Sequence, residues 1–395
     1  MNILLLYYTP FSEDDSFYWF YKQLVLWFNK KGYPSELHFC YLDKKEKEVI
    51  NGLQLPDAYS FNSQRNVSAI VNYMKLNKIK IVFNFYLPVW KIGAFFISIK
   101  NAYPDVKLIE LIHNCPNHSL QLKEYCLMNP DSGYRPSSLK ERIVKVFPKL
   151  YLILLKKKLH QENKQAYNLH DAIVVLSSSY ISEYLTMIGK EKSDKVFAIP
   201  NSLAPSSFLK SNVSIENKKK EILFVGGIRI EKSVMTLLKI WKEIQYKIPE
   251  WKLVIVGDGI QMPLCKKLYE DYNLERVEFK GYVDSRPLID RASILCLTSI
   301  IEGLPTVFLE AMSMGVIPIG FNTFSAIYDM IDNWKNGVII PAFDMELYAK
   351  SLIRLAKDDE LRFKIAKDAI LKVKQYDIEN VGEKWFVLFR DLKFL

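Results

Sequence analysis

Short apolar runs alternate with longer helix-like segments along this chain of 395 residues, and the second half repeats the rhythm of the first. Near-continuous apolar strands separated by helices are typical of parallel sheets that are covered on both faces. The expected strands are 3–8, 36–42, 79–85, 106–112 and 172–176 in the first half, and 222–225, 253–256, 277–280, 294–297 and 316–319 in the second. The pattern therefore predicts an α/β fold class with two doubly wound parallel-sheet (Rossmann-like) domains.

Length and composition agree with two such domains, because 395 residues exceed the usual size of a single core. We place the first domain at 1–203, a Ser- and Lys-containing linker at 204–220, the second domain at 221–376 and a C-terminal helix at 377–395. The five cysteines form no CxxC pair, which is typical of a reducing compartment. The first residues lack a basic leader and no apolar run reaches about 18 residues. We therefore expect a cytoplasmic protein.

One segment of the second half carries two carboxylates in a setting suited to a phosphorylated ligand. It reads Ser-Ile-Ile-Glu-Gly-Leu-Pro-Thr-Val-Phe-Leu-Glu-Ala-Met-Ser-Met-Gly over 299–315. Pro305 favours a helix start and Gly303 lets backbone approach a ligand, so open N–H groups could hold a phosphate. Glu310 falls inside an apolar helix, where a carboxylate needs a partner such as a sugar hydroxyl. Taken alone, the two glutamates also fit a simpler interpretation, in which one is a carboxylate at a helix N-terminus and the other is solvated.

A second candidate for phosphate binding follows the strand expected at 222–225. Gly226 and Gly227 let the backbone fold under a phosphate, and Lys232 adds a positive charge at the entrance of the next helix. The loop lacks a full G-x-G-x-x-G and the Walker spacing, so alone it also fits a plain strand-to-helix turn. Gly257 and Gly259 have no third glycine at the required spacing, which excludes a dehydrogenase-type fingerprint.

Together these motifs resemble those of the retaining GT-B glycosyltransferases with a Glu-x7-Glu motif, family four of the group 1 type. The family includes bacterial polysaccharide and lipopolysaccharide sugar transferases. The chain has Glu302-Gly-Leu-Pro and Glu310-Ala-Met with the family's spacing. Further segments similar to the family's occur in its order, at 199–202, 224–232, 254–259 and 279–283.

The resemblance implies a GT-B fold, with two domains facing across a cleft and a C-terminal helix that crosses back to the first domain. It also implies roles for residues of the second domain. Glu302, with backbone at Gly303 and Leu304, would orient the donor sugar. Glu310 would accept hydrogen bonds from the ribose hydroxyls. The donor diphosphate would meet Gly226, Gly227, Arg229 and Lys232, and the nucleobase would meet Gly281 and Tyr282.

Two positions depart from the family or match it loosely. Gly227 stands where the family usually has an arginine, so Arg229 would have to reach round or Lys232 and backbone N–H groups would hold the phosphates. His113 ends the strand expected at 106–112, where it could contact donor sugar or acceptor, or could be a satisfied loop histidine. The candidate catalytic residues are Glu302, Lys232 and His113.

The resemblance implies transfer of a hexose or N-acetylhexosamine from a nucleotide-diphosphate sugar, expected to be a UDP-sugar. The acceptor would be a saccharide or lipid-linked saccharide in capsule, lipopolysaccharide or O-antigen synthesis. We expect no cofactor and no obligatory metal, since cations and helix ends hold the leaving diphosphate in this family. A nucleotide-sugar epimerase of the same fold and a non-catalytic GT-B partner subunit remain alternatives, the latter because of Gly227.

The net charge of +10 is concentrated in one stretch. Residues 137–165 hold eight Lys or Arg against Glu141 and Glu162, with apolar residues between them. A basic amphipathic segment is typical of proteins that lie on an anionic membrane, here the inner face of the cytoplasmic membrane. A core-facing helix with a solvated basic face explains the pattern equally well. No nucleic-acid-binding fold is recognised, so we expect no nucleic-acid partner.

Overall fold

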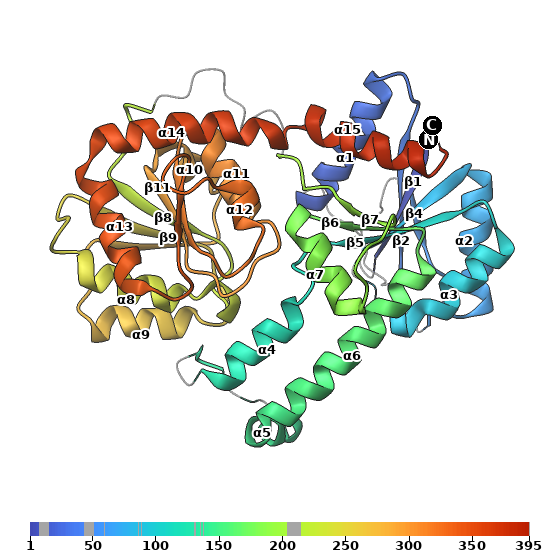
Figure 1. The fold of residues 1–395 in the computed structure, drawn as a ribbon, viewed down its shortest axis with the longest axis horizontal. Coiled ribbons are helices and arrows are strands. Elements are labelled where there is room, and N and C mark those ends of the chain that lie inside the picture. The colour runs from blue at the N-terminus through green and yellow to red at the C-terminus, as the bar shows by residue number, and fades with distance from the viewer. Residues whose placement is uncertain are drawn as a thin grey trace. The chain divides into compact units, whose positions relative to one another are not determined.

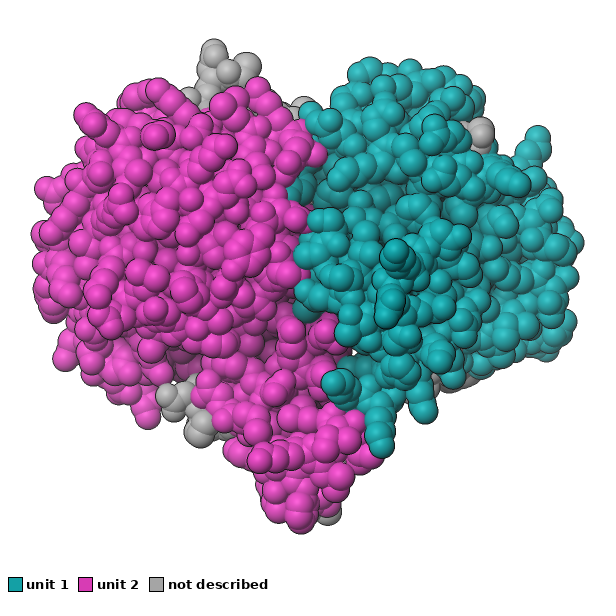
Figure 2. Space-filling model, viewed as in Figure 1, with its two compact units in different colours: residues 1–116, 156–205, 376–395 teal, residues 117–155, 206–375 magenta. Residues whose placement is uncertain are grey.

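The computed structural model describes residues 1–394 except 8–15, 43–50, 59, 86, 88, 130, 131, 135, 137 and 204–214. Most of the expected linker, 204–220, and the loop after the first strand therefore lie outside the described residues. The chain divides into two compact units, shown in Figure 2. One comprises Met1–Pro116, Lys156–Pro205 and Tyr376–Leu395, and the other comprises Asn117–Leu155 and Ser206–Gln375.

The first unit contains a seven-stranded parallel sheet with the order β3-β2-β1-β4-β5-β6-β7. Helices cover both of its faces (Figure 1). The strands are β1 (Asn2–Tyr7), β2 (Glu36–Tyr41), β3 (Gly52–Gln54), β4 (Ile79–Phe85), β5 (Lys107–Ile112), β6 (Ala172–Val175) and β7 (Val196–Ala198). The helices are α1 (Ser16–Lys30), α2 (Gln64–Leu76), α3 (Val89–Ala102), α7 (Ser178–Ile188) and α15 (Ile378–Asp391).

Alternation along the strands gives this sheet two apolar layers. Leu5 of β1 and Phe83 of β4 contribute to the layer beneath α1 and α15, whereas Leu4 and Val82 contribute to the layer beneath α2 and α3. Successive side chains of a strand point to opposite faces, so a strand buried on both faces is apolar throughout. That is why the sequence shows continuous apolar runs here.

The second unit contains a six-stranded parallel sheet with the order β10-β9-β8-β11-β12-β13. Its strands are β8 (Glu221–Val225), β9 (Lys252–Val256), β10 (Val277–Gly281), β11 (Ile294–Leu297), β12 (Ile317–Phe321) and β13 (Val338–Ile340). Its helices are α8 (Val234–Ile244), α9 (Met262–Asp271), α10 (Arg286–Arg291), α11 (Thr306–Ser313), α12 (Ile327–Met330), α13 (Met345–Lys357) and α14 (Asp359–Val373). The predicted fold class, two doubly wound parallel-sheet domains, is confirmed.

A helical excursion from the first half of the sequence packs on the second unit. It contains α4 (His118–Met128) and α5 (Leu139–Val146), and leads into α6 (Pro148–Leu169). Tyr125 of α4 stacks on Phe343 with ring centroids 5.6 Å apart, and the Gln261 amide donates to the Ser132 carbonyl at 3.1 Å. No helix among the described residues is long and apolar enough to cross a membrane.

Candidate functional site

The order of strands in the second unit creates a topological switch point between β8 and β11. The chain runs from β8 outward to β9 and β10, and then returns to place β11 on the other side of β8. Loops that leave neighbouring strands in opposite directions open a crevice at the carboxyl edge, where open α/β sheets bind ligands. Lys232 follows β8 and Glu302 follows β11. The predicted residues therefore meet at the edge where a ligand is expected.

Lys232 and Glu302 form an ion pair at this edge. The Lys232 Nζ lies 2.6 Å from Glu302 Oε1 and 2.9 Å from Oε2. The Ser299 hydroxyl also donates to Glu302 Oε1 at 2.6 Å, and Glu302 is buried. The Lys232 side chain keeps 20% of its surface exposed. Since an ammonium group has three N–H donors, Lys232 can keep Glu302 and still donate to an incoming anion.

The backbone around Lys232 is fixed from the β11 side as well. The Ile300 N–H donates to the Glu231 carbonyl at 2.8 Å, and the Thr298 hydroxyl donates to the Ser233 carbonyl at 3.0 Å. Thr298 is fully buried. The loops after β8 and β11 are therefore joined by backbone and side-chain bonds, so the ion pair is held in a defined place.

Two glycines that were not among the predicted site residues hold the β8 loop against the β9 loop. A Cβ atom on Gly257 would lie 1.9 Å from the Gly226 carbonyl oxygen, and one on Gly259 would lie 2.4 Å from the Ile228 carbonyl oxygen. The Gly226 N–H donates to the Val256 carbonyl at 3.0 Å, across the same contact. Only glycine allows backbone to approach this closely. In the sequence these two residues appear only as a Gly-Asp-Gly turn, which does not indicate the neighbouring loop that they will contact.

Gly281 continues this row of loops, whereas Tyr282 points away from it. The Gly257 N–H donates to the Gly281 carbonyl at 2.8 Å, so the ends of β9 and β10 are joined. Tyr282 is 92% exposed. The structure thus brings Gly226, Gly257 and Gly281 together at one edge and leaves the Tyr282 ring in solvent.

Arg229 lies beside Gly227, the position where the similar glycosyltransferases were expected to have an arginine. A Cβ atom on Gly227 would be 3.0 Å from Arg229 Nε, so the guanidinium occupies the space next to that position. Arg229 Nε also lies 3.0 Å from Glu231 Oε1, and more than half of the side chain is exposed. The Arg229 guanidinium is therefore a solvent-accessible cation next to Gly227.

The helix after the β11 loop carries the second glutamate. Helix α11 begins at Thr306, with Pro305 at the N-cap, one position earlier than the first turn in which the sequence placed it. Gly303 and Leu304 are buried just before it. Burial raises the pKa of Glu310 to about 7. Glu310 can therefore change its charge near neutral pH.

His118, which the sequence left without a role, lies near the ion pair. It is the first residue of α4, and its pKa is lowered chiefly by burial, with smaller effects from the charges of Glu231, Glu302 and Lys232. The imidazole therefore lies within electrostatic range of the Lys232–Glu302 pair. His118 was not predicted as a site residue. Nothing in the sequence indicates that the segment carrying it belongs to the second unit.

His113, a predicted catalytic residue, belongs to the first unit. Its Nε2 lies 2.9 Å from the Tyr21 hydroxyl, and Asn201 lines the same small cavity. Burial lowers the pKa of His113 to about 3, so the ring is neutral at physiological pH. Leu111, Ile199 and Trp385 surround it in a small cavity. In this setting the imidazole is a fixed, uncharged hydrogen-bonding group.

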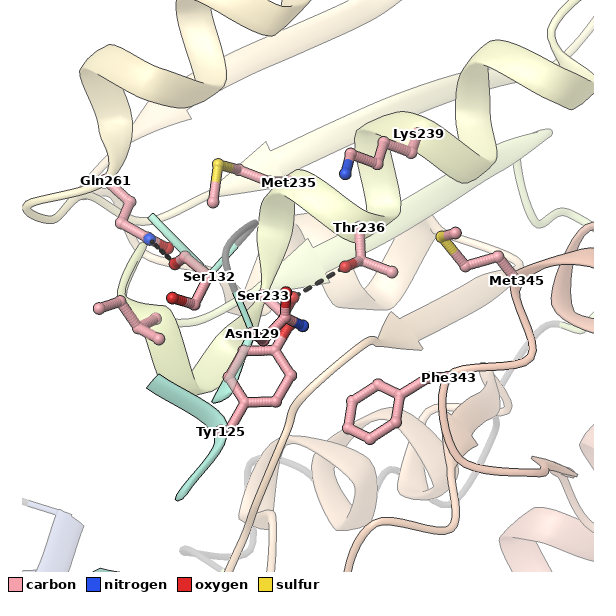
Figure 3. Close-up of a pocket in the computed structure, with 11 residues that line it drawn as sticks. Tyr125, Asn129, Ser132, Ser233, Met235, Thr236, Lys239, Gln261, Phe343 and Met345 are labelled. Atoms are coloured by element: carbon pink, nitrogen blue, oxygen red, sulfur yellow. Dashed lines mark hydrogen bonds between the residues drawn. The ribbon is translucent and has the colours of Figure 1, made fainter. Parts of the chain in front are cut away.

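A separate pocket of about 340 Å³ lies in the second unit between α4 and α8. Figure 3 shows its lining residues, with the Ser233 hydroxyl 2.8 Å from that of Thr236 and the Gln261 amide bonded to Ser132. Its described lining contains none of the predicted site residues. The residues that the structure describes also contain no cluster of three or more His, Cys, Asp or Glu that could hold a metal ion.

The strand ends described above fall within a segment that matches a known family. Residues 206–372 match the family model of the group 1 glycosyl transferases. An uncharacterized glycosyltransferase of Haemophilus influenzae is 31% identical over 198 residues, which are 50% of this chain and 55% of that protein. An α-1,4-N-acetyl-D-galactosaminyltransferase of Campylobacter jejuni, named for an undecaprenol-linked substrate, is 27% identical over 230 residues, 58% of this chain and 62% of its own length. The matches thus span between half and two thirds of these two relatives.

Solved structures share the fold over nearly the whole chain. The HepE protein of Anabaena, in complex with UDP and glucose, aligns with a TM-score of 0.71 at 12% identity over 99% of this chain and 100% of that one. The lipopolysaccharide outer core galactosyltransferase WaaB aligns with a TM-score of 0.71 at 17% identity, with the same coverage. These likenesses agree with the GT-B fold class expected from the sequence.

Proposed function

We propose that this chain is a retaining glycosyltransferase that transfers a hexose or N-acetylhexosamine from a UDP-sugar to a saccharide or lipid-linked saccharide acceptor. The observation that carries the proposal is the Lys232–Glu302 ion pair at the switch point, inside the segment that matches group 1 glycosyl transferases. The names of the relatives support the acceptor class, since the Campylobacter jejuni enzyme acts on an undecaprenol-linked saccharide. The setting would be surface polysaccharide synthesis in the cytoplasm.

In this proposal the second unit holds the donor. The diphosphate lies on the loop at Gly226 and Gly227, which has no side chains to hold a ligand away from the backbone, and Lys232 donates to its oxygens. Arg229, beside Gly227, supplies the charge that the family arginine would give. As the bond between sugar and diphosphate breaks, negative charge develops on the leaving group, and fixed cations stabilise it most at that moment. No metal is required for this step.

The two glutamates have different tasks in the same proposal. Glu302 keeps the Lys232 ammonium in place and, with the backbone at Gly303 and Leu304, orients the sugar. Glu310, once ionised, accepts hydrogen bonds from both ribose hydroxyls. His113 remains a proposed contact for sugar or acceptor, and its neutral ring suits hydrogen bonding rather than charge stabilisation.

Calorimetric titration of UDP, GDP and ADP into the purified protein tests the donor site. We expect UDP to bind, and Lys232→Ala to weaken it on the order of 10- to 100-fold, because a charge-assisted contact to the ligand is lost and buried Glu302 loses its cation. Glu310→Ala should weaken it as well. Lys266→Ala, an exposed lysine of α9, is the matched control and should bind like the parent.

Other outcomes of this titration separate the alternatives. Folded protein that binds none of the three nucleotides would favour the non-catalytic partner subunit. Nucleotide binding followed by conversion of the donor sugar without any saccharide acceptor would favour the epimerase. Transfer to an acceptor that survives EDTA is the result the proposal expects, whereas loss of transfer restored by added manganese would contradict the metal-free step.

A further inference from the structure

A run of large apolar side chains is exposed where α5 ends and α6 begins. The side chains are between 55% and 67% exposed, and they are Ile143, Val146, Phe147, Leu150, Ile153 and Leu154. Large apolar side chains gathered in this way cost free energy in water and mark a surface that contacts something else. We call these six residues, together with Arg142, Lys145 and Lys149, the α5–α6 patch.

The spacing of the six residues shows that they are arranged rather than scattered. Ile143 and Val146 of α5 lie three positions apart, and the three members on α6, at 150, 153 and 154, lie at i, i+3 and i+4, which is the spacing of one helical face. Phe147 lies between the two helices. In contrast, Ala166 and Tyr167 near the other end of α6 are buried. A helix that packs in a core explains the far end of α6, but it does not explain the start, whose apolar side chains face solvent.

The cations of the patch have no acidic partners in the part of the chain that the structure describes. Arg142, Lys145 and Lys149 are exposed, and none of the three has an ion pair among the residues that the structure describes. Residues 142–155 contain no Asp or Glu. Three further exposed lysines follow on α6 at 156–158, of which Lys158 pairs with Glu162 at 3.6 Å. Unpaired cations beside exposed aliphatic side chains call for a partner that is both anionic and apolar.

We propose that the α5–α6 patch docks on the surface of an anionic lipid bilayer. The apolar side chains would enter the boundary between headgroups and acyl chains, while the three cations would contact lipid phosphates. A second copy of the chain fits less well, because a symmetric contact would set these cations against their equivalents. Nucleic acid offers no apolar environment for the leucine and isoleucine side chains. The inference does not depend on the reaction proposed above.

Co-sedimentation with vesicles tests the docking surface directly. The full chain is mixed with phosphatidylcholine vesicles that contain about 30% phosphatidylglycerol, and with phosphatidylcholine alone. We expect binding to the anionic vesicles, weaker binding to the neutral ones, and a decrease as salt screens the cations. Lys145→Ala with Lys149→Ala should lower the partition coefficient about 25-fold, at roughly five-fold for each cation near the surface.

A second variant tests the apolar part, and controls test the position. Phe147→Ser with Leu150→Ser should lower vesicle binding at least ten-fold, and because both side chains are exposed the fold should persist by circular dichroism. Leu76→Ser, an exposed leucine of α2, and Lys266→Ala are the matched controls, which should bind like the parent.

Three results would overturn the inference. The first is folded protein that does not sediment with anionic vesicles. The second is equal loss of binding in the controls and the patch variants. The third is a dimer in analytical ultracentrifugation that Leu150→Ser dissociates, without vesicle binding by the parent, which would make this surface an interface between copies.

Discussion

At the scale of single residues, the two glutamates of one motif have different electrostatic settings. Glu302 is held by Lys232 and Ser299, whereas burial raises the pKa of Glu310 to about 7. An ionised carboxylate can accept from two hydroxyl groups, and hydrogen bonds of that kind stabilise the charged form. With a pKa near 7, the ionised fraction rises about ten-fold from pH 6 to pH 8. We predict that UDP affinity rises by up to about ten-fold over this range, measured by titration calorimetry at pH 6, 7 and 8.

Glu310→Gln is the control, because it keeps the shape and removes the titration. The phosphate of the nucleotide also titrates near pH 6, and the variant reports the pH dependence that this phosphate alone causes.

Unfolding gives an independent check of the direction in which the pKa of Glu310 is shifted. Because the pKa of Glu310 is raised in the folded protein from 4.5 to about 7, the native state binds more protons between these values and loses stability as pH rises. Denaturant midpoints of parent and variant that stay parallel from pH 5 to pH 8 would contradict the assignment.

The sequence predicted Lys232, Glu302 and Glu310 as site residues but could not predict that Lys232 and Glu302 pair. Their contact depends on β11 returning beside β8, which is a property of strand order. His118 was missed for the same kind of reason, since only the packing of α4 on the second unit brings it near. Local patterns identify residue types that suit a ligand, and the topology decides which of them meet.

At the scale of elements, the close packing of the loops that follow β8, β9 and β10 depends on glycine residues more than on any side chain. Gly257 has φ +128°, and its Cβ position is 1.9 Å from the Gly226 carbonyl oxygen. Gly257→Ala must therefore move the loop that precedes Lys232, because backbone cannot rotate away as a flexible side chain can. We predict a loss of UDP affinity of at least ten-fold, with measurable loss of stability, by calorimetry and thermal unfolding.

Gly32→Ala separates this effect from backbone strain in general. Gly32 also has a left-handed backbone, with φ +88°, but nothing lies within 4 Å of its Cβ position. It should lose about 1 kcal/mol of stability from the left-handed conformation and should keep its UDP affinity. Similar UDP affinities for the two variants would show that the contact between the β8 and β9 loops does not shape the site.

The elements themselves were predictable where they were long. The strands β4 and β11 begin and end where the sequence placed them, and the other expected strands differ by one or two residues. The strands β3, β7 and β13 were not predicted, because three residues are too short for a periodic signal. They add to sheet edges, where partner strands rather than their own sequence determine the structure.

At the scale of the whole molecule, the chain's last helix belongs to the core of the unit that contains its first strand. In α15, Trp385 packs on Phe83 with ring centroids 5.1 Å apart, and Glu379 accepts from the Trp27 indole N–H at 2.9 Å. Gly382 lies under that indole, and a Cβ atom there would be 2.5 Å from Trp27 Cδ2. The first sheet's stability therefore depends on residues more than 350 positions away in the sequence.

Gly382→Ala tests this dependence of the first unit on α15, because the substitution has two opposite effects on stability. Alanine favours a helix over glycine by about 1 kcal/mol, so an exposed site would gain stability. Here the methyl group must displace a buried indole, and overpacking of this kind costs roughly 1–3 kcal/mol. We predict net destabilisation, seen in hydrogen exchange as faster exchange in β1, β4 and α1, with β8 and β11 unchanged. Lys384→Ala, exposed on the same helix, should leave all of these unchanged. Equal acceleration in both sheets would mean that α15 does not stabilise the first unit selectively, and a more stable variant would mean that the indole yields without cost.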